Sequence, residues 1–393
     1  MNILEFGRVY QSYSFLKLLR LKSFFLICRF PFLTKNLGKI YRSFTKIAGP
    51  KITNKLLKGV YGDIFIGGEN LKELELCLRE VKKEGLFSIT DYAREFLTKE
   101  EEITEIDKII KVYKDSIDSA VKIDKENSIA IKISSFGNYE TMQTMNSIQH
   151  VLMIIEENFI HNKSYEEIRT ALKSKKVDVI PNQEEIEKLK SLFNGVIRDY
   201  DLNLYEALKN SNHQQNKNLL KIITSMFNLS PDALNEYKAY VQKLDSRLSE
   251  VFSHALSKNC SIMIDAEQSY LQIFIDYLAM NYFKSMNNEN CILMTTLQCY
   301  LKKEPENLTK IFNFCRLNNL AVGIKLVRGA YMNEENRIAN KKEVESPINP
   351  NIESTHENYT KSIHYIFENF KEKDRVIITY LSLIISINLY SSV

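Results

Sequence analysis

The sequence predicts an α/β fold in which short parallel strands alternate with helices. Beyond residue 260 there are four short apolar segments, each a strand candidate, and longer helical stretches separate them: 262–264, 292–297, 322–327 and 375–379. Strands that are joined by helical crossovers run parallel. Two of these strands end in polar strings, Asp265–Gln272 and Lys325–Tyr331. In parallel α/β folds the C-terminal ends of the strands carry the chemistry, so a functional site is predicted at this edge.

A fifth strand candidate, 129–133, precedes these four, and Gly137 closes it. The next stretch, about 139–257, has helical periodicity throughout. In it, Ser230-Pro231 is a good N-cap followed by a first-turn proline, and apolar residues from Ile186 to Ile197 keep the spacing of one buried helix face. The stretch is too long for a single crossover, so an inserted helical subdomain is predicted. By spacing alone, an open doubly wound sheet fits these elements as well as a barrel does.

The N-terminal segment, residues 1–60, is strongly basic. Residues 1–62 hold twelve Lys or Arg and a single acid, Glu5, although the whole chain carries only +4. This composition is typical of a mitochondrial presequence, and a basic surface arm on a cytosolic protein is the alternative. The apolar run 23–33 is interrupted by Arg29 and Pro31, which argues against a secretory signal and a membrane span, because a span needs about 20 apolar residues.

Residues 61–125 are predicted to form an N-terminal helical arm, and residues 126–393 the strand-containing domain. Leu71, Leu74, Leu78 and Val81 repeat at helical spacing in the arm. At 393 residues and 44% hydrophobic content, the chain is long enough to bury a large core. Its six cysteines show no CxxC or other metal spacing, so reduced thiols and no metal site are expected. No glycine-rich dinucleotide or P-loop string follows any strand, which disfavours Rossmann and kinase-like folds.

Several polar residues occupy the predicted strand ends, and each has a purely structural alternative. Lys132 lies in an apolar strand, where an ammonium group costs desolvation unless it is paired, but it could also reach solvent. Asp265 could simply cap the following helix. Gln298 could be a hydrogen-bonding residue at the rim of the sheet, and Lys325 alternates with Val327 on one strand face. Because all of them fall at the ends of successive strands, the functional interpretation is preferred.

These residues belong to motifs that resemble the proline dehydrogenase family, the flavin enzymes that oxidise L-proline. The motifs occur in the family's order: a strand with Lys132, then Asp265-Ala266-Glu267, then Gln298-Cys299-Tyr300, then Leu326-Val-Arg-Gly-Ala-Tyr331. Tyr61–Glu69 and Ser346–Pro350 also resemble the mitochondrial branch. The resemblance covers roughly residues 60 to 379 and implies a (β/α)8 barrel of the TIM type.

The resemblance implies a role for each matched residue. Lys132 would hold the proline carboxylate, Asp265 would belong to the charged network around the substrate, and Tyr331 would wall the pocket. The cofactor would be FAD. Gln298 would hydrogen-bond the flavin ring and Lys325 would lie beside its reactive nitrogen, while four residues of one turn would line it: Val327, Arg328, Gly329 and Ala330.

The resemblance further implies oxidation of L-proline to Δ¹-pyrroline-5-carboxylate, the first step of proline catabolism, with electrons passed to a quinone. The expected location is the mitochondrial matrix, with peripheral association with the inner membrane and no nucleic-acid partner. After Thr379 the sequence departs from the family pattern, so about five of the eight barrel strands are expected. The alternatives are a catalytically incompetent fragment with a binding or regulatory role, and a hydroxyproline dehydrogenase.

Overall fold

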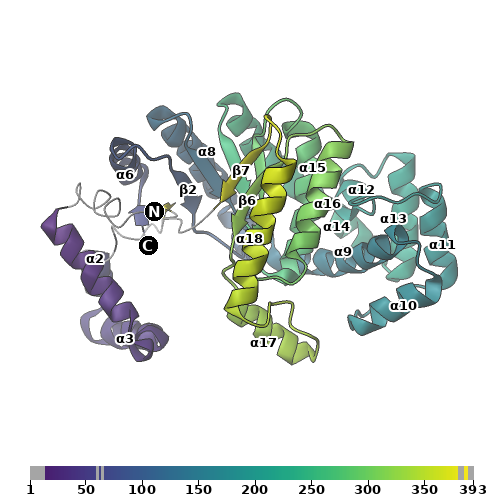
Figure 1. Cartoon of the computed structure of the whole chain (residues 1–393), viewed down its shortest axis with the longest axis horizontal. Coiled ribbons are helices and arrows are strands. Elements are labelled where there is room, and N and C mark those ends of the chain that lie inside the picture. The colour runs from purple at the N-terminus through teal and green to yellow at the C-terminus, as the bar shows by residue number, and fades with distance from the viewer. Residues whose placement is uncertain (1–13, 59–61, 63–65, 379–384, 388–393) are drawn as a thin grey trace. The chain divides into compact units, whose positions relative to one another are not determined.

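The computed structural model describes residues 14–58, 62, 66–378 and 385–387 (Figure 1). The chain divides into two compact units. The larger unit comprises Arg94–Asp118 and Ser128–Ser382, and the smaller comprises Met1–Ala93, Ser119–Asn127 and Leu383–Val393.

The larger unit is built on five parallel strands in the order β3-β4-β5-β6-β7. Their bounds are Ser128–Ile131, Ser261–Ile264, Leu293–Gln298, Gly323–Val327 and Arg375–Ile378. Each strand pairs in parallel with the next one along the chain, for example Thr295 with Ile324 and Ile324 with Val376. This sequential order is that of a (β/α) barrel, and it confirms the predicted position of 292–298 between the neighbouring strands. Thr379, the predicted end of β7, lies outside the described residues.

The strands form where branched apolar residues are buried on both faces of the sheet. Every residue of β3, β4 and β5 is buried, as expected for a parallel sheet covered by helices. The predicted strand 129–133 is shorter than expected. It ends at Ile131, because Ile133–Ser135 turn into a short 3₁₀ helix and leave Lys132 in extended backbone at the strand end.

Helices connect the strands and cover the sheet. Helices α14, α15 and α16 pack on β4 and β5, and α18 packs against α16 (Figure 1). The helices of the larger unit outside the long insertion are α7 (Lys99–Thr104), the first part of α8 (Ile106–Ile123), α15 (Ser269–Met286), α16 (Glu304–Leu317), α17 (Met332–Lys342) and α18 (Ile352–Asn369). Among the described residues, no helix is both long and apolar enough to cross a membrane.

The long crossover between β3 and β4 contains six helices: α9 (Tyr139–Ile160), α10 (Tyr165–Ser174), α11 (Gln183–Leu192), α12 (Leu204–Lys209), α13 (Gln214–Met226) and α14 (Pro231–Ser257). Ser230 caps α14 by accepting a hydrogen bond from the Ala233 amide, as its sequence predicts. The prediction that Ile186 to Ile197 lie on the face of one helix is wrong. Helix α11 stops at Leu192, because Asn194 and Gly195 both adopt positive φ.

The smaller unit contains α2 (Phe15–Cys28), α3 (Pro31–Ala48), α4 (Pro50–Leu57), β1 (Ile66–Gly68), α6 (Leu71–Lys83), β2 (Ile89–Tyr92) and β8 (Ile385–Ile387). Leu74 and Leu78 of α6 are buried, in agreement with the predicted helical periodicity. Strand β8 pairs in parallel with β1 and β2. Neither β2 nor β8 was predicted from the sequence. Residues 61 and 63–65 of the quoted motif Tyr61–Glu69 lie outside the described residues.

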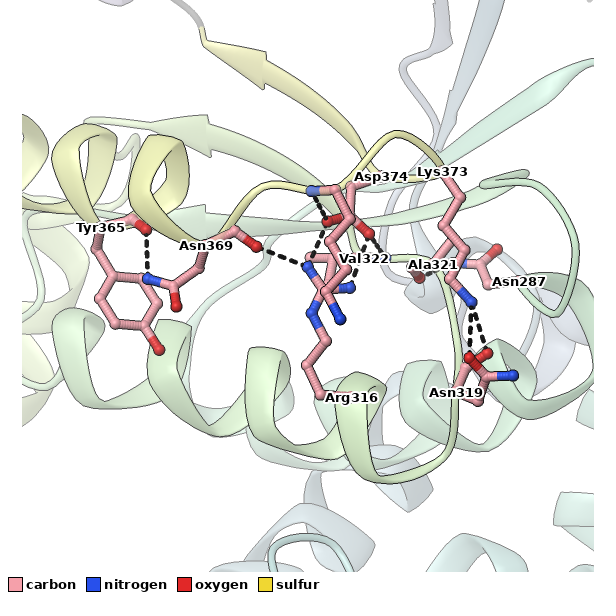
Figure 2. A network of polar contacts seen from close by, with 10 residues as sticks. Asn287, Arg316, Asn319, Ala321, Val322, Tyr365, Asn369, Lys373 and Asp374 are labelled. Atoms are coloured by element: carbon pink, nitrogen blue, oxygen red, sulfur yellow. Dashed lines mark hydrogen bonds and ion pairs between the residues drawn. The ribbon is translucent and has the colours of Figure 1, made fainter.

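A buried polar network fixes the N-terminal ends of β6 and β7 (Figure 2). The carboxylate of Asp374 accepts hydrogen bonds from the Arg316 guanidinium of α16, and from the amides of Val322 and Lys371 at 2.9 Å and 2.8 Å. Arg316 also donates to the carbonyl of Asn369. Because the network lies at the edge opposite the strand C-termini, it serves stability.

Candidate functional site

Three charged side chains, two from strand ends and one from the middle of β6, meet near the C-terminal edge of the sheet. Asp265, which follows β4, forms ion pairs with Lys132 after β3 and with Lys325 of β6. The Lys132 Nζ to Asp265 Oδ2 distance is 3.6 Å, and Lys325 Nζ binds Asp265 Oδ1. All three side chains are buried. Two ammonium groups therefore flank one carboxylate in a site largely shielded from water, where a pair of opposite charges interacts strongly.

Glu95 is a fourth charged residue of this cluster. Its carboxylate lies 3.6 Å from Lys132 Nζ. It comes from the segment just before α7, far from the motifs in the sequence, and nothing in the sequence marked it as part of the site. The cluster thus contains two ammonium groups and two carboxylates, and Lys132 is shared between Glu95 and Asp265.

A chain of hydrogen bonds through Glu267 joins the loops at four strand ends. Its carboxylate accepts from the Ser134 amide at 3.0 Å, and its carbonyl accepts from Gln298 Nε2 at 3.2 Å. Gln298 Oε1 in turn accepts from the Ala330 amide at 3.4 Å. Glu267 is 1% exposed, and burial raises the pKa of its carboxyl to about 7. Glu267 belongs to the Asp265–Glu267 motif, but nothing in the sequence indicated that it links these loops.

The turn after β6 requires glycine. Gly329 has φ of +124°, and a Cβ atom there would lie 1.3 Å from a ring carbon of Tyr300. Gly329 and Ala330 are exposed, whereas Val327 and Arg328 are half-buried. The Arg328 guanidinium lies over the ring of Tyr359, 4.2 Å from its centroid. The turn therefore presents backbone at the same edge as Gln298.

Tyr331 follows this turn and precedes α17. It is half-buried, and burial raises the pKa of its phenol above the ordinary value. The negative charge of Glu95 raises this pKa further, and the positive charge of Lys132 lowers it by a smaller amount. The structure thus places all the predicted site residues at one edge of the sheet. Lys132, Asp265 and Lys325 are in direct contact, Gln298 contacts Ala330, and Tyr331 lies within electrostatic range of the charged cluster. Val327 and Arg328 occupy the connecting strand end and turn.

The loop after β4 is anchored by a residue that the sequence did not indicate. Glu335 of α17 is 2% exposed and accepts hydrogen bonds from the amide and the hydroxyl of Ser269, at 2.7 Å and 2.5 Å. Ser269 is the first residue of α15. This contact fixes the start of α15 against α17, and so holds the Asp265–Gln268 loop over the strand end.

A cavity of about 1280 Å³ adjoins this edge, with Glu267 and Gln298 among its lining residues. It extends along α9 and α15, and its wall includes the segment after α10 and the C-terminal part of α17. The described residues contain no group of three or more His, Cys, Asp or Glu arranged to hold a metal ion. The groups that the edge offers are the charged cluster around Asp265, the Gln298 carboxamide and the exposed backbone of Gly329 and Ala330.

Comparison with known proteins identifies the family. The proline dehydrogenase family model matches residues 77–380, which is most of the chain. The chain is 25% identical over 347 residues to proline dehydrogenase 1, mitochondrial, of Dictyostelium discoideum, and 22% identical over 437 residues to the human protein of that name. These matches cover 88% and 93% of this chain, and 52% and 72% of the two relatives. The chain thus spans about half the length of the Dictyostelium relative.

A solved structure shares the fold. Proline utilization A (PutA) from Bdellovibrio bacteriovorus aligns with a TM-score of 0.51 and 15% sequence identity, over 84% of this chain and 27% of that one. At this identity the likeness supports the fold alone, and it agrees with the sequential order of the five strands. The extent of the family match decides the assignment: this chain belongs to the proline dehydrogenase family.

Proposed function

We propose that this chain is an FAD-dependent proline dehydrogenase that oxidises L-proline to Δ¹-pyrroline-5-carboxylate and passes the electrons to a quinone. The observation that carries the proposal is the position of Asp265 between the ammonium groups of Lys132 and Lys325. The cluster lies at the C-terminal edge of the sheet, where barrel enzymes place their chemistry. The family match supplies the substrate class.

The residues around the turn after β6 fit a flavin. The backbone of Gly329–Ala330 is exposed, so a planar ring can approach it closely. Gln298 would hydrogen-bond the ring, and Val327, Arg328, Gly329 and Ala330 would line it. When bound, the flavin supplies a two-electron acceptor for the hydride from proline. A buried ammonium group such as that of Lys325 stabilises negative charge that arrives next to it.

The substrate would be held at Lys132, on the other side of Asp265 from Lys325. Lys132 is a buried cation that can pair with the proline carboxylate, and its two acidic partners keep its ammonium group in place. Asp265 orients both lysines. Tyr331, half-buried at the start of α17, would close one wall and exclude water from the reacting atoms.

The same proposal includes a mitochondrial location. Residues 1–60 would be the targeting segment, residues 61–125 an N-terminal arm, and residues 126–393 the barrel domain with its helical insertion at about 139–257. The basic composition of the first segment and the mitochondrial names of the relatives support this. Peripheral contact with the inner membrane would bring the protein to its quinone.

The test is anaerobic flavin reduction by the full chain. The protein is loaded with FAD, and L-proline is added while the flavin absorbance is followed. We expect bleaching with L-proline, and bleaching slowed at least 100-fold in Asp265→Ala. Glu357→Gln, which alters an exposed ion pair of α18 with Lys361, is the matched control and should behave as the wild type. A chain that binds FAD but is not bleached by proline would refute the enzyme assignment. Bleaching by hydroxyproline alone would favour the hydroxyproline dehydrogenase alternative.

A further inference from the structure

The cavity beside the site is much larger than the proposed proline pocket requires. Its volume of about 1280 Å³ exceeds the 300–1,000 Å³ that is usual for small-molecule sites. It adjoins the strand edge through Gln298 and Glu267, and from there it follows α15 toward the inserted helices. The proposed function gives Gln298 a role at the flavin ring and leaves the part of the cavity along α9 and α15 unassigned.

Part of the cavity wall is aromatic and aliphatic, although polar and charged residues make up more than half of its lining. Tyr200, Tyr277 and Phe227 line it together with Ile273 and Ile338. Tyr200 and Tyr277 pack edge to face, with ring centroids 4.9 Å apart. Such a surface accepts a planar, apolar molecule.

The lysines that line the cavity are largely neutralised by neighbouring acids. Lys303 and Lys310 both pair with Glu157, at 2.9 Å and 2.5 Å. Lys302 pairs with Glu345 at 2.5 Å. These ion pairs hold the three ammonium groups against carboxylates of the wall, so they are already engaged before a ligand enters the cavity.

Burial raises the pKa of three carboxyl groups that line the cavity, to about 7 for Asp276 and Glu267 and to about 8 for Glu156, so each can hold a proton near neutral pH. Asp276 of α15 accepts a hydrogen bond from Gln272 Nε2 at 2.7 Å, and burial raises the pKa of its carboxyl to about 7. Gln272 Oε1 accepts from the Glu267 amide at 2.6 Å. The Gln272 side chain therefore links the Asp276 carboxyl, inside the cavity, to the backbone of Glu267 at the strand edge. The carboxyl group of Glu156 already accepts hydrogen bonds from the amides of Tyr200 and Leu202 and from the Tyr277 hydroxyl.

We propose that this cavity is the binding site of the electron acceptor, an apolar quinone, and that Asp276 supplies it with a proton. The inference rests on the proposed function, because it assumes a flavin beside Gln298. Oxidation of proline to Δ¹-pyrroline-5-carboxylate releases two electrons and two protons. The quinone takes up two electrons and two protons to become the hydroquinone. Asp276 gives one of these protons to a quinone oxygen and regains it from solvent through the cavity.

The first experiment measures binding without flavin. Equilibrium dialysis of the flavin-free full chain against decylubiquinone should show saturable binding. Ile338→Trp and Val179→Trp fill the cavity from two different elements, and each should weaken binding at least tenfold. Ile352→Trp makes the same substitution at a residue that is 62% exposed and does not line the cavity, so it should leave binding unchanged. Circular dichroism checks the fold of each variant, and the second cavity variant serves if the first does not fold.

The second experiment separates proton delivery from electron transfer. The proline-reduced protein is reoxidised either with decylubiquinone, which needs protons, or with ferricenium, which needs none. Asp276→Asn should slow reoxidation by the quinone at least tenfold and leave the ferricenium rate and proline reduction unchanged. Absence of quinone binding, or equal binding in the cavity variants and the wild type, would overturn the cavity assignment. Equal quinone rates in Asp276→Asn and the wild type would overturn the role of Asp276. Failure of proline to reduce the flavin would instead refute the proposed function.

Discussion

Replacing Asp265 by Asn should destabilise the protein by about 3 kcal/mol, because it leaves buried ammonium groups without their shared counter-ion. Removal of one partner from a buried ion pair costs about 3–5 kcal/mol. Lys132 keeps Glu95 at 3.6 Å, whereas Asp265 is the only acidic partner of Lys325 among the described residues. The cost therefore arises mainly at Lys325, which is 3% exposed, and falls at the lower end of that range.

Urea unfolding of the flavin-free chain at pH 7, followed by circular dichroism, measures this loss. The double variant Asp265→Asn with Lys325→Met should recover most of it, because neither buried charge remains. The matched control is Glu334→Gln, which alters an exposed pair with Arg337 and should leave the unfolding midpoint unchanged. The reasoning is refuted if Asp265→Asn costs less than about 1 kcal/mol, or if the double variant is no more stable than the single one.

Three further predictions concern the opposite sheet edge, the turn after β6 and the buried carboxyl. Asp374→Ala should cost about 3 kcal/mol, because Arg316 and two amides lose their acceptor, with faster hydrogen exchange at 320–323; unchanged exchange would contradict it. Gly329→Ala should lose at least tenfold in FAD affinity by fluorescence titration, since its Cβ collides with Tyr300; wild-type affinity would refute the flavin placement. The pKa of Glu267 is raised to about 7 when folded, so wild-type stability should fall as pH rises from 4.5 through 7, by about 3 kcal/mol. Glu267→Gln should show a decrease smaller by that amount, because Asp276, whose pKa is also raised to about 7, still contributes its own; an equal decrease in both proteins would count against the raised pKa of Glu267.

The strands and the site edge could be predicted because both depend on local patterns. A short apolar run followed by polar residues marks a buried parallel strand and its C-terminal end, and this located the residues around Asp265 and Lys325 correctly. The helix predicted from Ile186 to Ile197 failed for a local reason as well. The apolar spacing continues to Ile197, but Asn194 and Gly195 adopt positive φ. The helix therefore ends at Leu192, before the apolar pattern ends.

The partners within the site could not be predicted because they come from segments without a pattern of their own. Glu95 lies in an irregular stretch, and only the folded chain brings it to Lys132. Glu335 is one acid among several on a polar helix, yet it is 2% exposed and holds Ser269. In the same way, β2 and β8 are only four and three residues long, too short for a pattern of their own, so their pairing depends on tertiary contacts rather than on intrinsic preference.

The arrangement of the buried charges follows from the register of the strands. Ile264 pairs with Thr295, and Thr296 with Lys325, so the end of β4 and the middle of β6 lie at similar heights on either side of β5. Lys325 can therefore reach Asp265 across the intervening strand, over the small side chain of Thr296. A one-residue slip of β6 would move Lys325 to the other face of the sheet. The ion pair thus depends on the register as much as on the two residues, and a bulkier residue at Thr296 should separate them.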